Sequence, residues 1–251
     1  MRGVLLIALS IICVSPAQGA IAHTHSDQGF CDSGAGHGNI GSSCAGGVLT
    51  KTFTYTATAA NEAVVFALNC GGTTETSVSL SATGWTITSL SGVAGASGSR
   101  IASFAAISPN TTAATFTMTW STDCGAFMGD LVDEFSGTDL TGGTTTFDAN
   151  NSGTGSGSCS ITVTPANNND AVWGACEDSV TAVGSGYTKG ADDTSQDWSE
   201  YKILSGGSGV SQTVNFTGSG TWSEVAVTIK PSGAAAPTCN NTIALLGVGC
   251  R

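Results

Sequence analysis

Charged residues and histidines are scarce in this chain. Only 10% of its residues are charged, with 7 Lys and Arg against 18 Asp and Glu, and it has 3 His. An acidic chain with so few cations does not attract phosphate backbones, which excludes nucleic acid as a partner. His23, His25 and His37 all lie near the N-terminus and no Gly-x-Ser-x-Gly motif occurs, so a Ser-His-Asp hydrolase has no support.

Zinc-binding and membrane-spanning patterns are missing as well. No Cys-x-x-Cys occurs, and no histidine has the spacing to a cysteine that a zinc site requires. The apolar run from Gly3 to Val14 follows Met1-Arg2 and precedes Ser-Pro and small residues, which is typical of a secretory signal peptide. We expect a signal peptide over 1–22, cleaved after Gly19 or Ala22. The mature protein would then be extracellular or periplasmic, without a membrane span.

Cysteines are what this chain does have. Of the 9 cysteines, Cys13 leaves with the signal peptide, and the even number that remains predicts disulfides in an exported protein. The stretch from Cys159 to Cys176 predicts a β-hairpin with these two cysteines opposite each other, on the face that carries Ile161, Val163 and Val172. Sequence proximity and elimination predict three further pairs: Cys31–Cys44, Cys239–Cys250 and Cys70–Cys124.

Alternation of apolar residues with threonine indicates short β-strands through the middle of the chain. Phe53, Tyr55 and Ala57 alternate with threonines, and Phe116, Met118 and Trp120 do the same, while no stretch has helical periodicity. About a dozen such strands predict an all-β fold. We expect a two-sheet antiparallel β-sandwich, jelly-roll-like and disulfide-stapled, with one core.

The composition divides the mature chain into three parts. The Gly- and Ser-rich segment 23–47 predicts a disulfide-closed loop with one short edge strand and little core. The β-sandwich domain spans 48–231. A spacer then leads to a disulfide-closed C-terminal tail, the two together covering 232–251.

Several motifs within 48–231 resemble one group of secreted modules. The succession WSTDCGAFMGDLVDEFSGTD, NNNDAVWGACED, GSGYTKG, SEYKIL and GSGTWSEVAVTIKP is similar to jelly-roll-like β-sandwich modules of secreted bacterial and phage-associated proteins. Most of those proteins lack an assigned function. The resemblance implies a surface, adhesive or glycan-facing role, and it supplies no catalytic residues.

Tryptophans are the candidate ligand-binding residues. Trp120 alternates with core residues, whereas Trp173 and Trp222 alternate opposite to the inward residues of their strands, and Trp198 lies in an acidic loop. We therefore expect Trp173, Trp198 and Trp222 to be exposed and able to stack on sugars, with edge packing as the alternative. The leading hypothesis is a non-catalytic protein that binds a polysaccharide or cell-surface glycan.

Acidic residues support the competing hypothesis of a secreted polysaccharide-active enzyme. Paired carboxylates hydrolyse glycosides, and the candidates are Asp130, Asp133, Glu134, Glu177, Glu200 and Glu224. Acids on the outer face of a strand are nevertheless usually solvated. The turn from Asp192 to Asp197 offers oxygen ligands for calcium, although it is more typical of an exposed acidic turn.

A copper site is a further alternative, and it depends on signal cleavage. Cleavage after Ala22 would make His23 the N-terminus, so that its amine, two backbone amides and the His25 imidazole form a square-planar site for copper(II). Secreted copper oxygenases that attack polysaccharides similarly begin with histidine. Their second histidine comes much later in the chain, whereas no histidine follows His37 here. Cleavage after Gly19 would remove the terminal amine from the site.

Overall fold

A computed structural model describes residues 19–233 apart from 33–35, 39–48, 97, 125–126, 178 and 194–195. The described chain is almost entirely β-strand, with one short 3-10 helix and no helix long and apolar enough to cross a membrane. Its elements are β1 (Ala22–Asp32), β2 (Gly36–Gly38), β3 (Thr50–Tyr55), β4 (Ala63–Cys70), β5 (Val78–Ala82), β6 (Ile87–Ser89), β7 (Ala94–Ala96), β8 (Ser99–Ile107), β9 (Ala114–Trp120), β10 (Phe127–Ser136), η1 (Gly143–Thr145), β11 (Ala149–Ser156), β12 (Cys159–Val163), β13 (Ala171–Glu177), β14 (Thr188–Asp192), β15 (Trp198–Ile203), β16 (Gln212–Phe216) and β17 (Thr221–Ile229).

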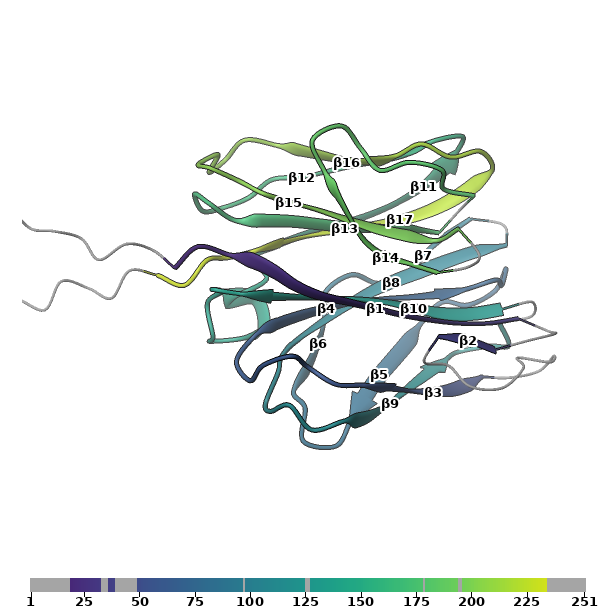
Figure 1. The fold of residues 1–251 in the computed structure, drawn as a ribbon. Helices are drawn as coiled ribbons and strands as arrows, with labels where there is room; N and C mark the ends of the chain where they lie inside the picture. The colour runs from purple at the N-terminus through teal and green to yellow at the C-terminus, as the bar shows by residue number, and fades with distance from the viewer. Residues whose placement is uncertain are drawn as a thin grey trace, which may run out of the picture.

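The strands form four antiparallel sheets stacked in layers (Figure 1). One large sheet has seven strands, in the order β2-β1-β10-β4-β8-β6 with β7 also paired to β8, and the other has five, in the order β11-β17-β13-β15-β14. These two large sheets face each other. The small sheet β3-β9-β5 covers the outer side of the first, and β12-β16 covers the outer side of the second. The predicted all-β, antiparallel sandwich is confirmed, with four sheets in place of the expected two.

Three apolar clusters fill the spaces between the four layers. The first core, between β3-β9-β5 and the seven-stranded sheet, is rich in aromatic rings such as Phe53, Phe66 and Phe116. The second core lies between the two large sheets, and the third lies between the five-stranded sheet and β12-β16. The single core expected from the sequence is therefore wrong. Both faces of each large sheet are buried, which explains the continuous apolar run of β4.

The two halves of the chain repeat one strand order. In the first half β1-β10-β4-β8-β6 faces a small sheet containing β3 and β9, and in the second half β11-β17-β13-β15-β14 faces β12 and β16. The register agrees as well, because Ala63 pairs with Ile107 as Ala171 pairs with Ile203. Corresponding residues at the start of β4 and β13 are Asn61 and Asn169 (both φ 64), Glu62 and Asp170, Ala63 and Ala171, and Val64 and Val172.

The first sandwich is the seven-stranded sheet with β3-β9-β5, and the second sandwich is the five-stranded sheet with β12-β16. The contact between the two sandwiches is reciprocal. By this correspondence β8 matches β15 and β10 matches β17, and across the second core β8 packs on β17 while β10 packs on β15. Both contacts carry a hydrogen bond: Ser223 Oγ donates to the Ser99 carbonyl at 3.0 Å, and Ser199 Oγ donates to Asp133 Oδ2 at 2.5 Å. Such reciprocal contacts are those of an isologous, two-fold interface.

β1 departs from the expected N-terminal loop. It has 11 residues and lies between β2 and β10 inside the seven-stranded sheet. Ile21 and Phe30 are buried at 5% and 6% exposure. The expectation of a short edge strand with little core is therefore wrong, since β1 pairs with β10 along most of its length and satisfies backbone groups of that strand.

Two of the predicted disulfides are present, but the predicted hairpin is not. Cys159 and Cys176 are bonded, yet β12 pairs with β16 while β13 pairs with β15 and β17. The turn between β12 and β13 carries the chain from one sheet to the facing sheet, so the disulfide crosses the third core. Cys70 and Cys124 are also bonded. The pairs Cys31–Cys44 and Cys239–Cys250 lie outside the described side chains.

Candidate functional site

His23 and His25, the predicted copper ligands, lie on β1 but contact different layers. The His23 ring stacks on Tyr201 with centroids 4.2 Å apart, on the side of the second core. The His25 ring is 6.3 Å from Tyr55, whose side chain belongs to the first core. A register shift between the two histidines accompanies this change of face. The two imidazoles therefore do not converge on one ion. Among the described residues, no group of three or more His, Cys, Asp or Glu side chains is placed to hold a metal ion.

The packing of residues 19–22 also separates the two cleavage alternatives. Ile21 is buried in the second core, and Ala22 pairs with Ser136 at the start of β1. Cleavage after Ala22 would remove both residues from the fold, whereas cleavage after Gly19 would keep them. If the expected signal peptide is cleaved, this packing is compatible with cleavage after Gly19 and not with cleavage after Ala22, and His23 then lacks the terminal amine that the copper hypothesis requires.

Asp133 is the centre of a buried hydrogen-bond network. Its Oδ1 accepts from Ser26 Oγ at 2.6 Å and lies 2.8 Å from His23 Nε2. Its Oδ2 accepts from Trp173 Nε1 at 2.7 Å and from Ser199 Oγ at 2.5 Å. Ser26 Oγ is 3.1 Å from the same His23 Nε2. A catalytic triad needs the serine and the aspartate on opposite ring nitrogens, so this Ser-His-Asp group lacks the geometry of a hydrolase.

The six acids proposed for glycoside hydrolysis are all buried. Strands β10, β13, β15 and β17 lie in the two large sheets, which are covered on both faces, so the expectation of solvated acids is wrong. Exposure is 0% for Asp130, Asp133, Glu134, Glu200 and Glu224 and 2% for Glu177. Burial raises the pKa of Glu134 and, more strongly, that of Glu177.

Glu200 and Glu224 form a buried pair of carboxyls on the third-core face of the five-stranded sheet. Burial raises the pKa of Glu200 to about 7, although the backbone amides of Gly184 and Asn215 donate to its carboxylate at 2.6 and 3.0 Å. Burial, and then the charge of Glu200, raises the pKa of Glu224 to about 9. Neither oxygen of Glu224 has a hydrogen-bond partner. Both carboxyls are therefore largely protonated at mildly acidic pH.

Asp193 and Asp197, from the segment considered for calcium, are buried, whereas residues 194 and 195 between them lie outside the described chain. Asp193 and Asp197 are 4% and 3% exposed, so the expected exposed turn is wrong. Asn69 Nδ2 donates to Asp197 Oδ2 at 2.6 Å, and the Asp197 amide donates to Asp193 Oδ1 at 2.9 Å. These hydrogen bonds join Asp193 to Asp197 and Asp197 to the end of β4.

Three of the four tryptophans considered from the sequence are core residues. Trp120 is 1% exposed, as expected. Trp173 is 0% exposed and Trp222 is 7% exposed, so their expected exposure is wrong. Alternation fails as a guide here because β13 and β17 are buried on both faces. Trp198 is partly buried, and Lys189 Nζ covers its ring at 3.7 Å from the centroid.

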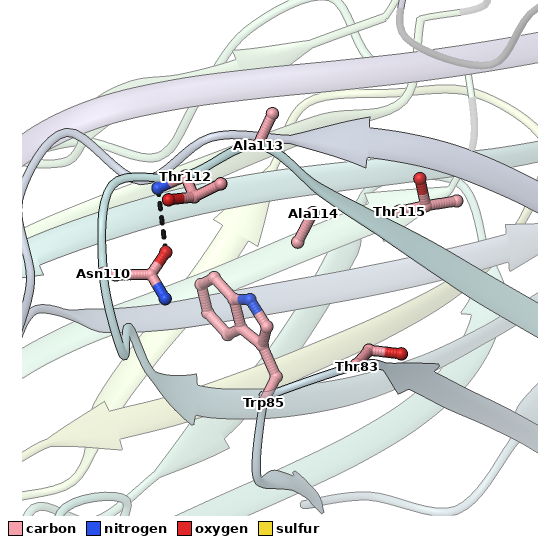
Figure 2. Close-up of a pocket in the computed structure, with 7 residues that line it drawn as sticks. All are labelled: Thr83, Trp85, Asn110, Thr112, Ala113, Ala114 and Thr115. Carbon is pink, nitrogen blue, oxygen red and sulfur yellow. Dashed lines mark hydrogen bonds between the residues drawn. The ribbon is translucent and has the colours of Figure 1, made fainter.

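The remaining tryptophan, Trp85, borders an open hollow of about 310 Å³ (Figure 2). Trp85 is not among the tryptophans expected to stack on sugars from the sequence, although it directly follows the Thr83-Gly84 turn after β5. Figure 2 shows its ring between Asn110 and Ala114. The hollow is lined by Thr83, Trp85, Asn110, Thr112, Ala113, Ala114 and Thr115.

A tight turn and the first core hold the Trp85 ring in place. The Trp85 amide donates to the Ala82 carbonyl at 3.2 Å, and the turn contains Gly84 at φ 82, a left-handed conformation that favours glycine. The indole packs edge-to-face on Phe116 and Tyr55, with centroids 5.1 and 6.2 Å apart. One side of the ring is therefore fixed by the core while the other borders the hollow.

Asn110 supplies a fixed polar group at this hollow. Asn110 Oδ1 accepts from the Thr112 amide at 2.8 Å, which orients the side-chain amide and leaves its NH₂ group available to a ligand. Threonine hydroxyls complete the lining, which contains no charged side chain. An aromatic face beside a few neutral hydrogen-bonding groups is the chemistry that recognises an uncharged sugar ring.

The second sandwich carries no counterpart of this aromatic residue. Thr88 of β6 pairs with Ala105 of β8, and Thr188 of β14 pairs with Tyr201 of β15. Ala105 and Tyr201 correspond in the repeat, so the two threonines hold the same place at the edges of their large sheets. Counting back three residues from each threonine places Ser185 where Trp85 stands in the first half. By this count the indole that borders the hollow has no aromatic counterpart in the second sandwich.

Comparison of the chain with protein-family models, with curated proteins and with solved structures finds no match in any of the three.

Proposed function

We propose that this chain is a secreted, non-catalytic β-sandwich protein that binds a neutral glycan at the Trp85 hollow. The observation that carries the proposal is the hollow itself, in which a partly buried indole held by the core borders an uncharged lining of threonines and Asn110. Sugar rings have apolar faces that stack on indoles, and their hydroxyls pair with amide and hydroxyl groups.

Export of the protein is supported by its disulfides and by the N-terminal apolar run. Two disulfides within the folded body, Cys70–Cys124 and Cys159–Cys176, are typical of proteins that fold in an oxidising compartment. A role at a cell surface or on a polysaccharide follows from such a location together with a glycan-binding hollow.

Binding is preferred over catalysis because the hollow lacks the groups that glycoside chemistry needs. Its lining has no carboxyl, imidazole or thiol. The carboxyls that could act as acid and base, including Glu200 and Glu224, are buried in the strands of the large sheets. Acid and base catalysis requires both groups within hydrogen-bond reach of the scissile bond.

Alanine replacement of Trp85, with Trp198→Ala as a matched control, tests the proposal. The secreted protein is first tested for retention on cellulose, chitin, xylan and mannan, and its affinity is then measured by calorimetry on soluble fragments of the polysaccharide retained. Trp85→Ala should weaken binding at least about 30-fold, which corresponds to loss of a tryptophan anchor worth about 2 kcal/mol. Trp198→Ala should leave the affinity unchanged, since Trp198 does not line the hollow.

Each result has a defined meaning once thermal unfolding shows that both variants are folded. Loss of binding in Trp198→Ala with retention in Trp85→Ala would place the site elsewhere. Failure of the wild type to bind any neutral polysaccharide would overturn the binding function. Release of soluble sugars during incubation would support the enzyme alternative instead.

A further inference from the structure

A second hollow, of about 460 Å³, adjoins the Trp85 hollow. The segment 83–88 lies between them, and alternate residues of this segment line different hollows. Thr83 and Trp85 border the first hollow, whereas Gly84, Thr86 and Thr88 border the second. The loop after β8 is shared in the same way, with Pro109 in the second hollow and Asn110 in the first. The two hollows are therefore neighbours across one strip of chain.

An exposed leucine, Leu140, borders the second hollow on a loop held by hydrogen bonds and an ion pair. Leu140 is 53% exposed, the second most exposed of the large hydrophobic residues in the described chain. The preceding residue, Asp139, accepts hydrogen bonds from the Thr141 amide and hydroxyl at 2.9 and 2.7 Å and pairs with Lys230 at 2.8 Å. Thr146 Oγ1 donates to the Asp139 carbonyl at 2.6 Å. The loop thus holds an apolar side chain in water, in a fixed place, beside a hollow.

The lining of the second hollow matches the first in charge and adds apolar contact. Ile107, Pro109 and Leu140 supply apolar surface, while threonine hydroxyls and the glycine-rich 140–143 segment supply polar groups. Neither hollow is lined by a charged residue, and the chain has a formal net charge of -11. Both observations favour an uncharged ligand, since a polyanion would be repelled and would find no cation to pair with.

The strip between the hollows is at the edge of its sheet. Within the described strands β6 pairs only with β8, so one side of its backbone faces away from the sheet. An unpaired strand edge presents amide and carbonyl groups to a ligand that crosses it. A polymer lying over this edge would contact the ring of Trp85 on one side and Leu140 on the other.

We infer that the two hollows are two subsites for a single neutral, linear polysaccharide chain that crosses the edge segment 83–88. This inference rests on the proposed glycan-binding function and adds to it the ligand class and the need for several sugar units. The Trp85 subsite stacks one sugar ring, and the Leu140 subsite packs against a later unit of the same chain. Affinity must then increase with the length of the oligosaccharide until both subsites are filled.

A length series of oligosaccharides, combined with Leu140→Ser, tests the two-subsite arrangement. The probes are cello-, chito-, xylo- or manno-oligosaccharides of two to six units, chosen to match the polysaccharide that the wild type retains, with oligogalacturonates of equal length as anionic probes. The wild type should bind the six-unit probe at least about tenfold more tightly than the two-unit probe. Leu140→Ser should weaken the affinity for the six-unit probe about fivefold or more, as expected for a half-buried leucine. The affinity for the two-unit probe should stay unchanged.

Val210→Ser is the matched control, because Val210 is 56% exposed and lines neither hollow. It should bind every probe as the wild type does. An affinity that is independent of length, or a Leu140→Ser variant with unchanged length dependence, would overturn the two-subsite inference while the Trp85 site stands. Tighter binding of oligogalacturonates than of neutral probes would overturn the ligand class. Absence of binding to every probe would instead refute the proposed function itself.

Discussion

The unpartnered carboxyl of Glu224 predicts that this protein loses stability as the pH rises. Burial, followed by the nearby charge of Glu200, raises the pKa of Glu224 to about 9 from its ordinary 4.5. A folded-state pKa above the unfolded value means that the folded protein holds the proton more tightly. The resulting stabilisation is fully present below the unfolded pKa and is lost as the pH rises toward the folded pKa.

The size of this effect follows from the pH window. Between pH 5 and pH 8 the unfolded chain has an ionised Glu224 while the folded chain keeps it protonated. The free energy of unfolding then falls by about 1.36 kcal/mol per pH unit, or about 4 kcal/mol over the window. Glu200, with a pKa raised to about 7, adds a smaller loss in the lower part of the same window. The Tyr187 hydroxyl lies in the same region. Its pKa is raised by burial and then by the charges of Glu200 and Glu224.

Glu224→Gln isolates the contribution of this one carboxyl. Neither oxygen of Glu224 accepts a hydrogen bond, so an amide of the same shape replaces it without breaking one. The variant should match the wild type at pH 5 and exceed it by about 4 kcal/mol at pH 8. Denaturant unfolding at each pH, followed by tryptophan fluorescence with the disulfides intact, measures the difference. Asp123→Asn, at an exposed position, is the control for a change of one charge.

Two outcomes would contradict the predicted role of Glu224. One is a wild-type unfolding midpoint that stays constant or rises from pH 5 to pH 8. The other is a Glu224→Gln variant whose stability falls in parallel with that of the wild type, which would show that this carboxyl is not the buried proton-binding group.

The Asp133 network and the N-terminus give two further predictions. Asp133→Ala should lower the free energy of unfolding by about 3–5 kcal/mol, because it leaves Trp173 Nε1 and Ser199 Oγ buried without their acceptor. Denaturant unfolding measures this change, and a decrease below about 1 kcal/mol would show that the network is solvated. The intact mass of the secreted protein should correspond to a chain that begins at Ala20, and non-reducing peptide maps should contain Cys70–Cys124 and Cys159–Cys176; a chain beginning at His23 would contradict the packing of Ile21.

The sequence predicts local structure well where one face of a strand is exposed. Alternation around Phe53 and Phe116 correctly identifies β3 and β9, because the outer faces of their small sheet meet solvent. The same rule fails for Trp173. A strand in the middle of four layers has no exposed face, so alternation carries no information about which side chains reach solvent.

The disulfide prediction shows a second limit of local reasoning. The separation of Cys159 and Cys176 suits a hairpin within one sheet and equally an arch between two facing sheets, because both place the cysteines opposite each other. Pairing partners of β12 and β13 come from distant parts of the chain, and the local sequence does not specify them. The cysteine pair could therefore be predicted although its register could not.

The candidate site depends on tertiary structure to a greater extent. Trp85 and Asn110 are separated by 25 positions in the sequence, and the hollow between them arises only when the segment before β6 lies beside the loop after β8. Composition indicates only that tryptophans exist. Which of them borders open space is decided by how the sheets stack.

The reciprocal contact between the two sandwiches gives the chain the layout of a dimer whose subunits are covalently joined. An interface in which β8 meets β17 while β10 meets β15 has the reciprocity of a symmetric homodimer of one sandwich, here with both copies joined in a single chain. Because the two copies are joined in one chain, their association does not depend on protein concentration. Each copy can also differ in sequence from the other. Trp85 in one copy and Ser185 in the other are the kind of difference that this freedom permits.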